Sequence, residues 1–204
     1  MEIKDRFRGY LPVVIDLETG GFDSNQNPIL ELACCFVSMN SEKLELCEEH
    51  VWEVEPFPGA IIEPSSLKVT GINMEDPNRQ AFSEKTVLSD FFALVRKRIK
   101  VEGCTRAILV AHNASFDQAF INSACERGSI KRNPFHPFSS IDTASIAAIA
   151  YGHTVLSESC HRAGLDFDDA KAHGASYDAN RTAWLFCKIV NKSPFTQKKT
   201  LLPN

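Results

Sequence analysis

Apolar and polar positions follow two different periods along the chain, and together they predict an α/β order. Near-continuous or alternating apolar runs of strand length occur at 13–17, 29–39, 48–56 and 106–113. Apolar residues at helical spacing occur at 82–100, 116–126, 142–152 and 177–190, and Ser83 is the predicted N-cap of the first of these helices. Early strands in a meander, followed by alternating strands and helices, predict one mixed sheet flanked by helices in a single domain.

The first of these strands ends in two acids on the same face. In VVIDLETGGF, Asp16 and Glu18 are two positions apart, so their side chains point to the same side of an extended strand. Like charges held this close repel, and each loses hydration. The pair is tolerated if one acid stays protonated, if arginines neutralise it, or if a divalent cation binds between the two. The strand alone leaves all three explanations open.

Two further groups of polar residues occur near predicted helix starts. Asp117 follows LVAHNASF and falls in the first turn of a helix, after a strand end of the kind where ligands gather in α/β proteins. The ordinary interpretation is an acid favoured by the helix dipole. His173 and Asp178 diverge by about 140° on a continuous helix, so they converge only if His173 precedes the helix. A surface histidine is the ordinary alternative.

Composition narrows the setting of this chemistry. The chain has 204 residues, 44% of them hydrophobic, with no run approaching the roughly 20 apolar residues of a membrane span. The charged N-terminus MEIKDRFRGY lacks the apolar segment of a secretory signal. Seven cysteines without a C-x-x-C pair indicate reduced thiols in a cytoplasm and no zinc site. The net charge of −4 argues against nonspecific nucleic-acid affinity, so such binding would depend on local basic clusters.

Taken in order, the acids and the histidine resemble a known superfamily. Asp-x-Glu on the first buried strand, an Asp opening a mid-chain helix and His-x-x-x-x-Asp at a late helix resemble the DEDD exonucleases, in their histidine-bearing DEDDh branch. Four blocks look more specifically like the ribonuclease T family: DRFRGYLPVVIDLETGGF, RAILVAHNASFDQAF, KRNPFHPFSSIDTASIAAIA and LFCKIVN. The resemblance implies a ribonuclease-H-like exonuclease domain over residues 1–191, with a mixed five-stranded sheet. The tail over 192–204 has no apolar periodicity, so we expect it to be poorly ordered.

The resemblance implies a metal-dependent 3′→5′ exonuclease that releases nucleoside 5′-monophosphates. Its catalytic positions are matched by four acids that would hold two Mg²⁺ ions, with Mn²⁺ as a substitute, and by one general base: Asp16, Glu18, Asp117, Asp178 and His173. Two metals about 3.5–4 Å apart stabilise the attacking and leaving oxygens together. Carboxylates are the hard oxygen ligands that these cations prefer.

The resemblance also implies how nucleic acid is held. Phe22, Phe116 and Phe138 match rings that stack terminal bases, with burial in the core as the alternative interpretation of each. Six basic residues match a surface that binds substrate across a homodimer: Arg6, Arg8, Lys100, Arg106, Lys131 and Arg132. The expected substrates are 3′ ends of tRNA and other stable RNAs, and also single-stranded DNA. The expected location is a bacterial cytoplasm, with no membrane association.

Three positions lie outside the catalytic set or depart from the family pattern. Asp142 in SSIDT could serve the site, but an N-cap or supporting role is the stronger interpretation. Ribonuclease T members act poorly on 3′-terminal cytosine and carry a Glu and a Phe where EPSSLKVTGI has Ser65 and Val69. We therefore expect weaker stacking of the last base and a blunted bias against terminal cytosine.

Three rival classes share parts of this pattern. A proofreading subunit of a DNA polymerase would have the acids and the histidine but no reason for KRNPFHPF. An oligoribonuclease usually has a tyrosine where His173 stands. A catalytically dead module that only binds nucleic acid would have lost at least one acid, whereas all four acids and the base are present here.

Overall fold

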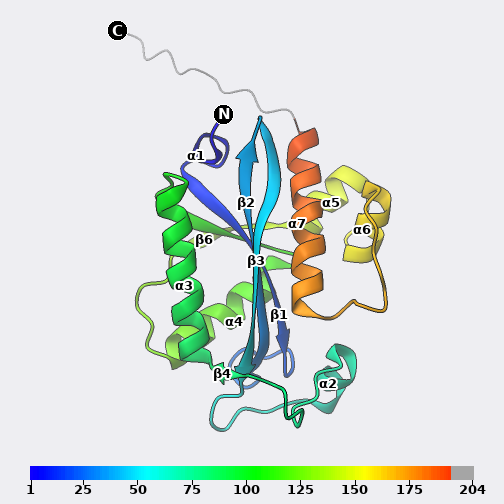
Figure 1. Cartoon of the computed structure of the whole chain (residues 1–204). Helices are drawn as coiled ribbons and strands as arrows, with labels where there is room; N and C mark the ends of the chain where they lie inside the picture. The colour runs from blue at the N-terminus through cyan, green and yellow to red at the C-terminus, as the bar shows by residue number, and fades with distance from the viewer. Residues whose placement is uncertain (194–204) are drawn as a thin grey trace.

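The computed structural model describes residues 1–193, which form a six-stranded sheet with helices on both faces (Figure 1). The strands are β1 (Tyr10–Thr19), β2 (Ile29–Asn40), β3 (Lys43–Glu55), β4 (Phe82–Ser83), β5 (Arg106–Ala111) and β6 (Phe135–Asp142). The helices are α1 (Ile3–Arg6), α2 (Pro64–Thr70), α3 (Glu84–Val101), α4 (Ala114–Arg127), α5 (Thr143–Tyr151), α6 (Leu156–Ala163) and α7 (Ala175–Lys192). Of the tail expected over 192–204, the structure describes only Lys192, which ends α7, and Ser193, its C-cap.

The sheet has the strand order β4-β3-β2-β1-β5-β6. β1 runs antiparallel to β2 and parallel to β5, so it is hydrogen-bonded along both edges and buried on both faces. The prediction of a mixed sheet flanked by helices is confirmed, but the expected count of five strands is wrong. The described residues form six strands, because β4 pairs with Val54 and Glu55 of β3. Two residues are too few to produce a period, so β4 left no pattern in the sequence.

The two faces of the sheet are covered by different parts of the chain. α3 and α4 pack against one face, and α7, backed by α5 and α6, packs against the other (Figure 1). The largest fully buried side chains include five phenylalanines: Phe36, Phe91, Phe92, Phe120 and Phe186. Burying one such ring stabilises a fold by about 1.5–3 kcal/mol. A large share of the phenylalanine content is therefore structural.

Polar residues fix the starts of two helices as the sequence predicted. The Ser83 hydroxyl oxygen accepts the N–H of Thr86 at 3.3 Å, at the start of α3. The Asp142 carboxylate accepts the N–H groups of Ala144 and Ser145 at the start of α5. Both act as N-caps, which satisfy donors that have no partner inside the helix.

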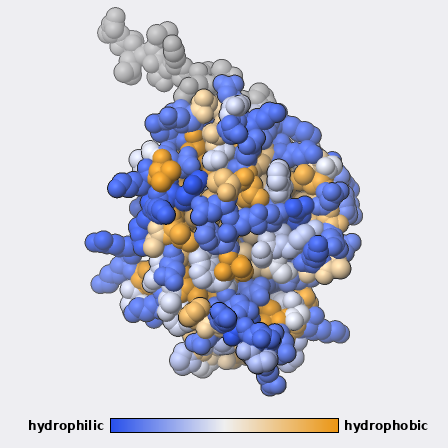
Figure 2. Space-filling view, in the orientation of Figure 1, coloured by the Kyte–Doolittle hydropathy of each residue, from blue (hydrophilic) through white to orange (hydrophobic). Residues whose placement is uncertain are grey.

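The surface and the cysteines agree with the compositional analysis. The face seen in Figure 2 is largely hydrophilic, with apolar residues in small separate groups. No helix within residues 1–193 is long and apolar enough to cross a bilayer. All seven cysteines are free, and five are buried. Burial raises the pKa of the Cys125 thiol to about 11, so this residue packs as a small apolar side chain rather than a reactive thiolate.

Candidate active site

Three carboxylates from the two ends of the chain meet at the end of β1. Asp16 and Glu18 project from the same face of this strand, and Asp178 comes from the first turn of α7. One oxygen from each of the three lies within 4.8 Å of the others. The register between β1 and β2 shifts directly after Glu18, so the regular ladder ends where the acids are displayed. This group is called the acidic cluster below.

The segment before α7 turns sharply and brings His173 to the cluster. His173 has a φ of 63°, in the left-handed region that few non-glycine residues adopt. Its backbone N–H donates to Asp178 Oδ2 at 3.1 Å. His173 therefore precedes the helix and Asp178 lies within it, which is the one arrangement in which residues at this spacing converge. The imidazole itself is exposed to solvent.

Asp117 supports the cluster from the opposite side of the sheet. It lies in the first turn of α4 and is only 3% exposed. Burial raises its pKa to about 8, although hydrogen bonds from backbone groups, including that of Leu17, act in the other direction. Its charge is the strongest of those that act on Asp16. The structure thus brings all four predicted acids together, with three in direct reach of one point.

The electrostatics of this site are unfavourable without a cation. Desolvation, and then the charges of Asp117, Glu18 and Asp178, raise the pKa of Asp16 well above its ordinary value. Burial, with Asp178 next in importance, raises the pKa of Glu18 to about 8. Asp178 Oδ1 is buried and has no hydrogen-bond partner. A buried carboxylate oxygen without a donor is costly, and a bound cation would satisfy it. The donor set therefore fits a metal ion.

Glu31 is an acid of this site that the sequence analysis missed. It stands opposite Glu18 in the β1–β2 ladder, and its charge adds to the pKa increases of Asp16 and Glu18. Its own pKa is raised by burial, and a hydrogen bond from the backbone of Ala175 opposes that increase. The signal was present, since ILELACCF places one acid in an apolar strand just as VVIDLETGGF does.

A small cavity beside the acids has aromatic and aliphatic walls. It measures about 190 Å³ and is lined by Glu18, Phe22, Phe116, Ser65 and Val69, among others. Phe22 is 81% exposed. Its ring lies edge-on to that of Phe116, with 6.2 Å between the ring centres. Phe22 is therefore not part of the core. Phe116 also packs against the buried Phe120, with 4.8 Å between the ring centres. We call this space the rim pocket.

Phe138 lies on β6 and is 90% exposed. The centre of its ring lies 6.2 Å from that of His136, and the His136 ring centre lies 5.4 Å from that of Tyr10. The guanidinium of Arg8 lies 5.2 Å from the Tyr10 ring. A row of partly and fully exposed rings thus connects Arg8, a predicted basic residue, to Phe138, a predicted stacking residue.

The other predicted basic residues are distributed over several places. Arg106 and Lys131 line a common cavity of about 390 Å³ with His136. Lys100 and Arg132 are exposed. Arg6, in contrast, donates to Val190 O at 3.3 Å and Ser193 O at 3.4 Å, at the end of α7. The structure therefore places Arg106 and Lys131 on one cavity and gives Arg6 a contact with the last helix.

Asp142 connects the starts of two helices. Besides capping α5, its Oδ1 accepts the N–H groups of Asn113 at 2.8 Å and Ala114 at 3.3 Å, where α4 begins. Hydrogen bonds to its ionised form outweigh desolvation and lower its pKa. Asp142 is thus a helix cap placed one turn from Asp117, as its sequence context favoured.

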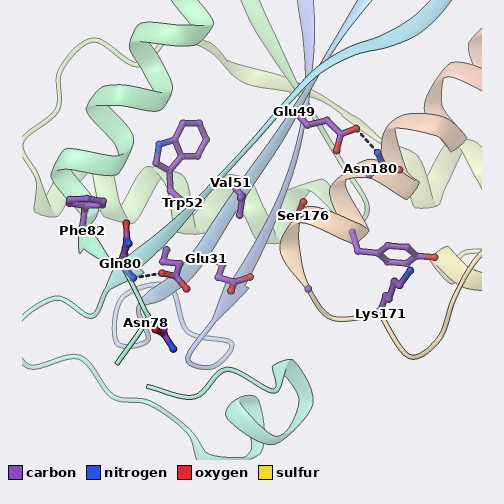
Figure 3. A pocket seen from close by; sticks show the side chains of 13 residues that line it. Glu31, Glu49, Val51, Trp52, Asn78, Gln80, Phe82, Lys171, Ser176 and Asn180 are labelled. Atoms are coloured by element: carbon purple, nitrogen blue, oxygen red, sulfur yellow. Dashed lines mark hydrogen bonds between the residues drawn. The ribbon is translucent and has the colours of Figure 1, made fainter. Parts of the chain in front are cut away.

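A wider cavity of about 920 Å³ opens next to the His173 segment (Figure 3). Glu31, Glu49 and Glu53 line it, and Figure 3 shows Glu49 hydrogen-bonded to Asn180, at 2.6 Å. Three carboxylates and a single lysine repel a phosphate backbone. This space does not suit a nucleic-acid strand, despite its size.

Comparisons with known proteins agree with this geometry. The exonuclease family model RNase_T matches residues 13–186. Ribonuclease T of Hahella chejuensis is 53% identical over 188 residues, which cover 92% of this chain and 86% of that protein. Two solved structures share the fold. E. coli exonuclease I in complex with a dT13 oligonucleotide has a TM-score of 0.67 at 17% identity, over 90% of this chain but only 41% of its own length. The nuclease domain of 3′hExo, a DEDDh family member bound to rAMP, has a TM-score of 0.68 at 20% identity, over 88% of this chain and 90% of its own.

The family model, the relative, the fold and the acidic cluster place the chain among 3′→5′ exonucleases, which are hydrolases of phosphodiester bonds. Within that class, the chain belongs to the ribonuclease T family.

Proposed function

We propose that this exonuclease trims single-stranded 3′ ends of RNA in a metal-dependent reaction and releases nucleoside 5′-monophosphates. The observation that carries the proposal is the acidic cluster, in which oxygens of Asp16, Glu18 and Asp178 converge within 4.8 Å. Asp117 is the fourth ligand in this assignment. Carboxylates alone favour Mg²⁺, with Mn²⁺ as a substitute, over zinc, which prefers histidine and cysteine.

Four acids at this spacing would hold two cations. Bound cations stabilise the charge that develops on the attacking and leaving oxygens of an in-line displacement. The acids contribute fixed geometry, because they project from a central strand and from the first turns of two helices. Rigid elements of this kind keep reacting groups aligned better than loops do.

His173 acts as the general base in this proposal. It takes a proton from the attacking water, a role typically worth about 10²–10⁴-fold in rate. Exposure leaves its imidazole free to exchange that proton with solvent. The hydrogen bond from its backbone to Asp178 ties the position of the base to the cluster that it serves.

The rim pocket holds the last base of the substrate. Phe22 and Phe116 supply stacking faces, and each stacked base contributes about 1–3 kcal/mol without regard to sequence. Val69 has no ring to stack on a base, and the hydroxyl of Ser65 is too short to reach as a glutamate carboxylate does. The terminal base is therefore bound more weakly than in relatives with Phe and Glu at these positions. Phe138 extends the stacking surface toward β6.

Substrate and assembly follow the family in this proposal. The substrates are 3′ ends of tRNA and other stable RNAs, and single-stranded DNA, bound across a homodimer by the basic residues around Arg106 and Lys131. Support comes from related folds, since the exonuclease I structure holds a dT13 oligonucleotide and the 3′hExo domain holds rAMP. Seven free thiols fit a reducing cytoplasm.

The proposal is tested with 5′-labelled RNA and DNA oligonucleotides incubated with Mg²⁺, with Mn²⁺ and with EDTA. We expect a ladder that shortens one nucleotide at a time from the 3′ end, free 5′-monophosphates, and no reaction in EDTA. Glu49→Gln is a matched control, because it removes a nearby acid that lies outside the cluster. Internal cleavage, or shortening that persists in EDTA, contradicts the proposal.

A further inference from the structure

A partly buried ion pair lies at the far end of α4 from the acids. Arg127 ends α4 and Glu84 begins α3. Arg127 Nε donates to Glu84 Oε2 at 2.9 Å, and Nη2 donates to Oε1 at 2.8 Å, which makes the pair bidentate. Glu84 is only 6% exposed. Such a fork fixes geometry as well as charge.

The third nitrogen of Arg127 reaches the loop that carries Phe22. Nη1 donates to the carbonyl oxygen of Ser24 at 2.7 Å. The Ser24 hydroxyl also meets that of Ser123 at 2.9 Å, one turn earlier on α4. The Phe22 loop is therefore attached to α4 at two points, both next to Arg127.

The same guanidinium also supports the segment that leads to α2. Arg127 Cζ lies 4.0 Å from the centre of the ring of Phe57, a residue in the connection between β3 and α2. That connection is joined to the Phe22 loop by two hydrogen bonds of 2.8 Å: Ile61 N–H to Gln26 O, and Asn27 Nδ2 to Ile61 O. α2 then carries Val69 into the rim pocket.

The three walls of the rim pocket thus depend on one side chain. Phe22 stands on the loop held through Ser24, Phe116 stands on the helix that Arg127 ends, and Val69 stands on α2. Arg127 is about 15 Å along α4 from Asp117, since ten residues rise 1.5 Å each. It therefore does not touch the reacting atoms.

We propose that Arg127, held by Glu84, is a positioning residue that sets the gap between Phe22, Phe116 and α2 and thereby the grip on the terminal base. The inference rests on the proposed function, in which the rim pocket holds that base. A partly buried ion pair of this kind is a weak source of stability, because desolvation and solvent screening offset the attraction. The geometry matters instead: two donors of Arg127 bind Glu84, and the third, Nη1, then fixes the Phe22 loop through Ser24 O.

The test compares Arg127→Lys and Arg127→Met with the parent protein. KM for single-stranded oligonucleotides rises about tenfold, within the contribution of one stacked base, while kcat changes little. Hydrolysis of bis(p-nitrophenyl) phosphate, which has no base to stack, stays at the parental rate. Glu84→Gln and Phe57→Leu give smaller increases in KM, and they serve as second variants if the arginine substitutions unfold the protein.

Arg98→Met is the matched control. Arg98 also lies on a helix, bonds Glu102 at 3.0 Å and is partly buried, but it contacts no rim element. An unchanged KM in Arg127→Lys and Glu84→Gln, an equal increase in Arg98→Met, or a parallel loss with bis(p-nitrophenyl) phosphate overturns the proposal. Oligonucleotide affinity, measured by fluorescence anisotropy in Ca²⁺, should decrease in the variants in the same order as KM increases. Because this measurement needs no turnover, it tests the role of Arg127 even if the parent protein has no exonuclease activity.

Discussion

The floor and the rim of the candidate active site are built in opposite ways. The floor consists of Asp16, Glu18, Asp117 and Asp178. The rim consists of the exposed residues of the rim pocket, Phe22, Ser65 and Val69, together with Phe138 on β6. Floor residues are at most partly exposed and project from the central strand or from first turns of helices. Rim residues stand on a loop, a seven-residue helix and an outer strand, and Phe22 and Phe138 are 81% and 90% exposed.

This difference separates chemistry from substrate preference. The charges of Glu18, Asp117 and Asp178 raise the pKa of Asp16, and those of Asp178 and Asp117 raise the pKa of Glu18, so the floor acids behave as a group. Rim residues make few interior contacts, so their substitution changes binding without disturbing the fold. We therefore expect substitutions in the floor to abolish activity. Substitutions in the rim should only change substrate affinity by degrees.

Asp16→Asn tests the floor and has the largest expected effect. It removes ligand charge without volume, so we expect kcat to fall by about 10³-fold or more, since metal ions supply several kcal/mol of charge stabilisation. The fold should persist, because like-charge repulsion is relieved. Rates in Mg²⁺ and circular dichroism measure the two effects. Appreciable Mg²⁺-dependent activity in the pure variant would remove Asp16 from the site.

Charge reversal at Lys131 and Arg132 tests the contribution of the basic surface. Two lost phosphate contacts reduce the salt-dependence slope by about 1.4 and weaken binding, while kcat at saturation stays unchanged. Affinities measured over a series of salt concentrations give this slope. If the surface acts across a dimer, mixing this variant with Asp16→Asn restores part of the activity. Absence of rescue after verified subunit exchange contradicts the trans arrangement.

The pair Ser65→Glu and Val69→Phe tests the rim. A ring at position 69 adds a stacking face. One stacked base contributes about 1–3 kcal/mol to binding, so KM should fall at least severalfold. Terminal cytosine should become a stronger block than in the parent protein. Initial rates on oligonucleotides that differ only in the 3′ base measure both effects. A strong cytosine block in the parent, unchanged in the variant, assigns the discrimination to Phe22 and Phe116.

The pH dependence of metal-free stability tests the floor without any substrate. Glu18 and Asp117 have a pKa of about 8 in the folded protein, against ordinary values of 4.5 and 3.8. The folded state therefore binds more protons than the unfolded state between these values, so stability is highest at low pH and falls as pH rises through about 8. In EDTA, the melting temperature should fall from about pH 5 to 8.5, and Asp117→Asn should flatten the fall. A melting temperature that rises over this range contradicts the assignment.

Local patterns predicted most of the fold. Ser83 and Asp142 were recognisable as caps because capping depends on neighbours only two or three residues away. β4 was not predictable, because a two-residue strand exists only where another strand lies beside it. β6 was also absent from the predicted strands, since FHPFSSID contains a proline and does not alternate.

The same limit applies to the site. Asp16 stood out as a charge in an aliphatic strand, and Glu31 offered the same signal, although only the paired strands show why it matters. The contact between Glu84 and Arg127 spans 43 positions and has no local signature. Contacts of this kind arise from the packing of helices and loops, which single-sequence periodicity does not report.

The catalytic floor joins the first strand to the last helix, and this has a consequence during synthesis. About 160 residues separate Asp16 from Asp178, and a ribosome adds roughly 5–20 residues per second. For roughly 8–32 s after Asp16 is made, the nascent chain lacks a complete set of acids. The acidic cluster therefore cannot assemble until the start of α7 has been synthesised.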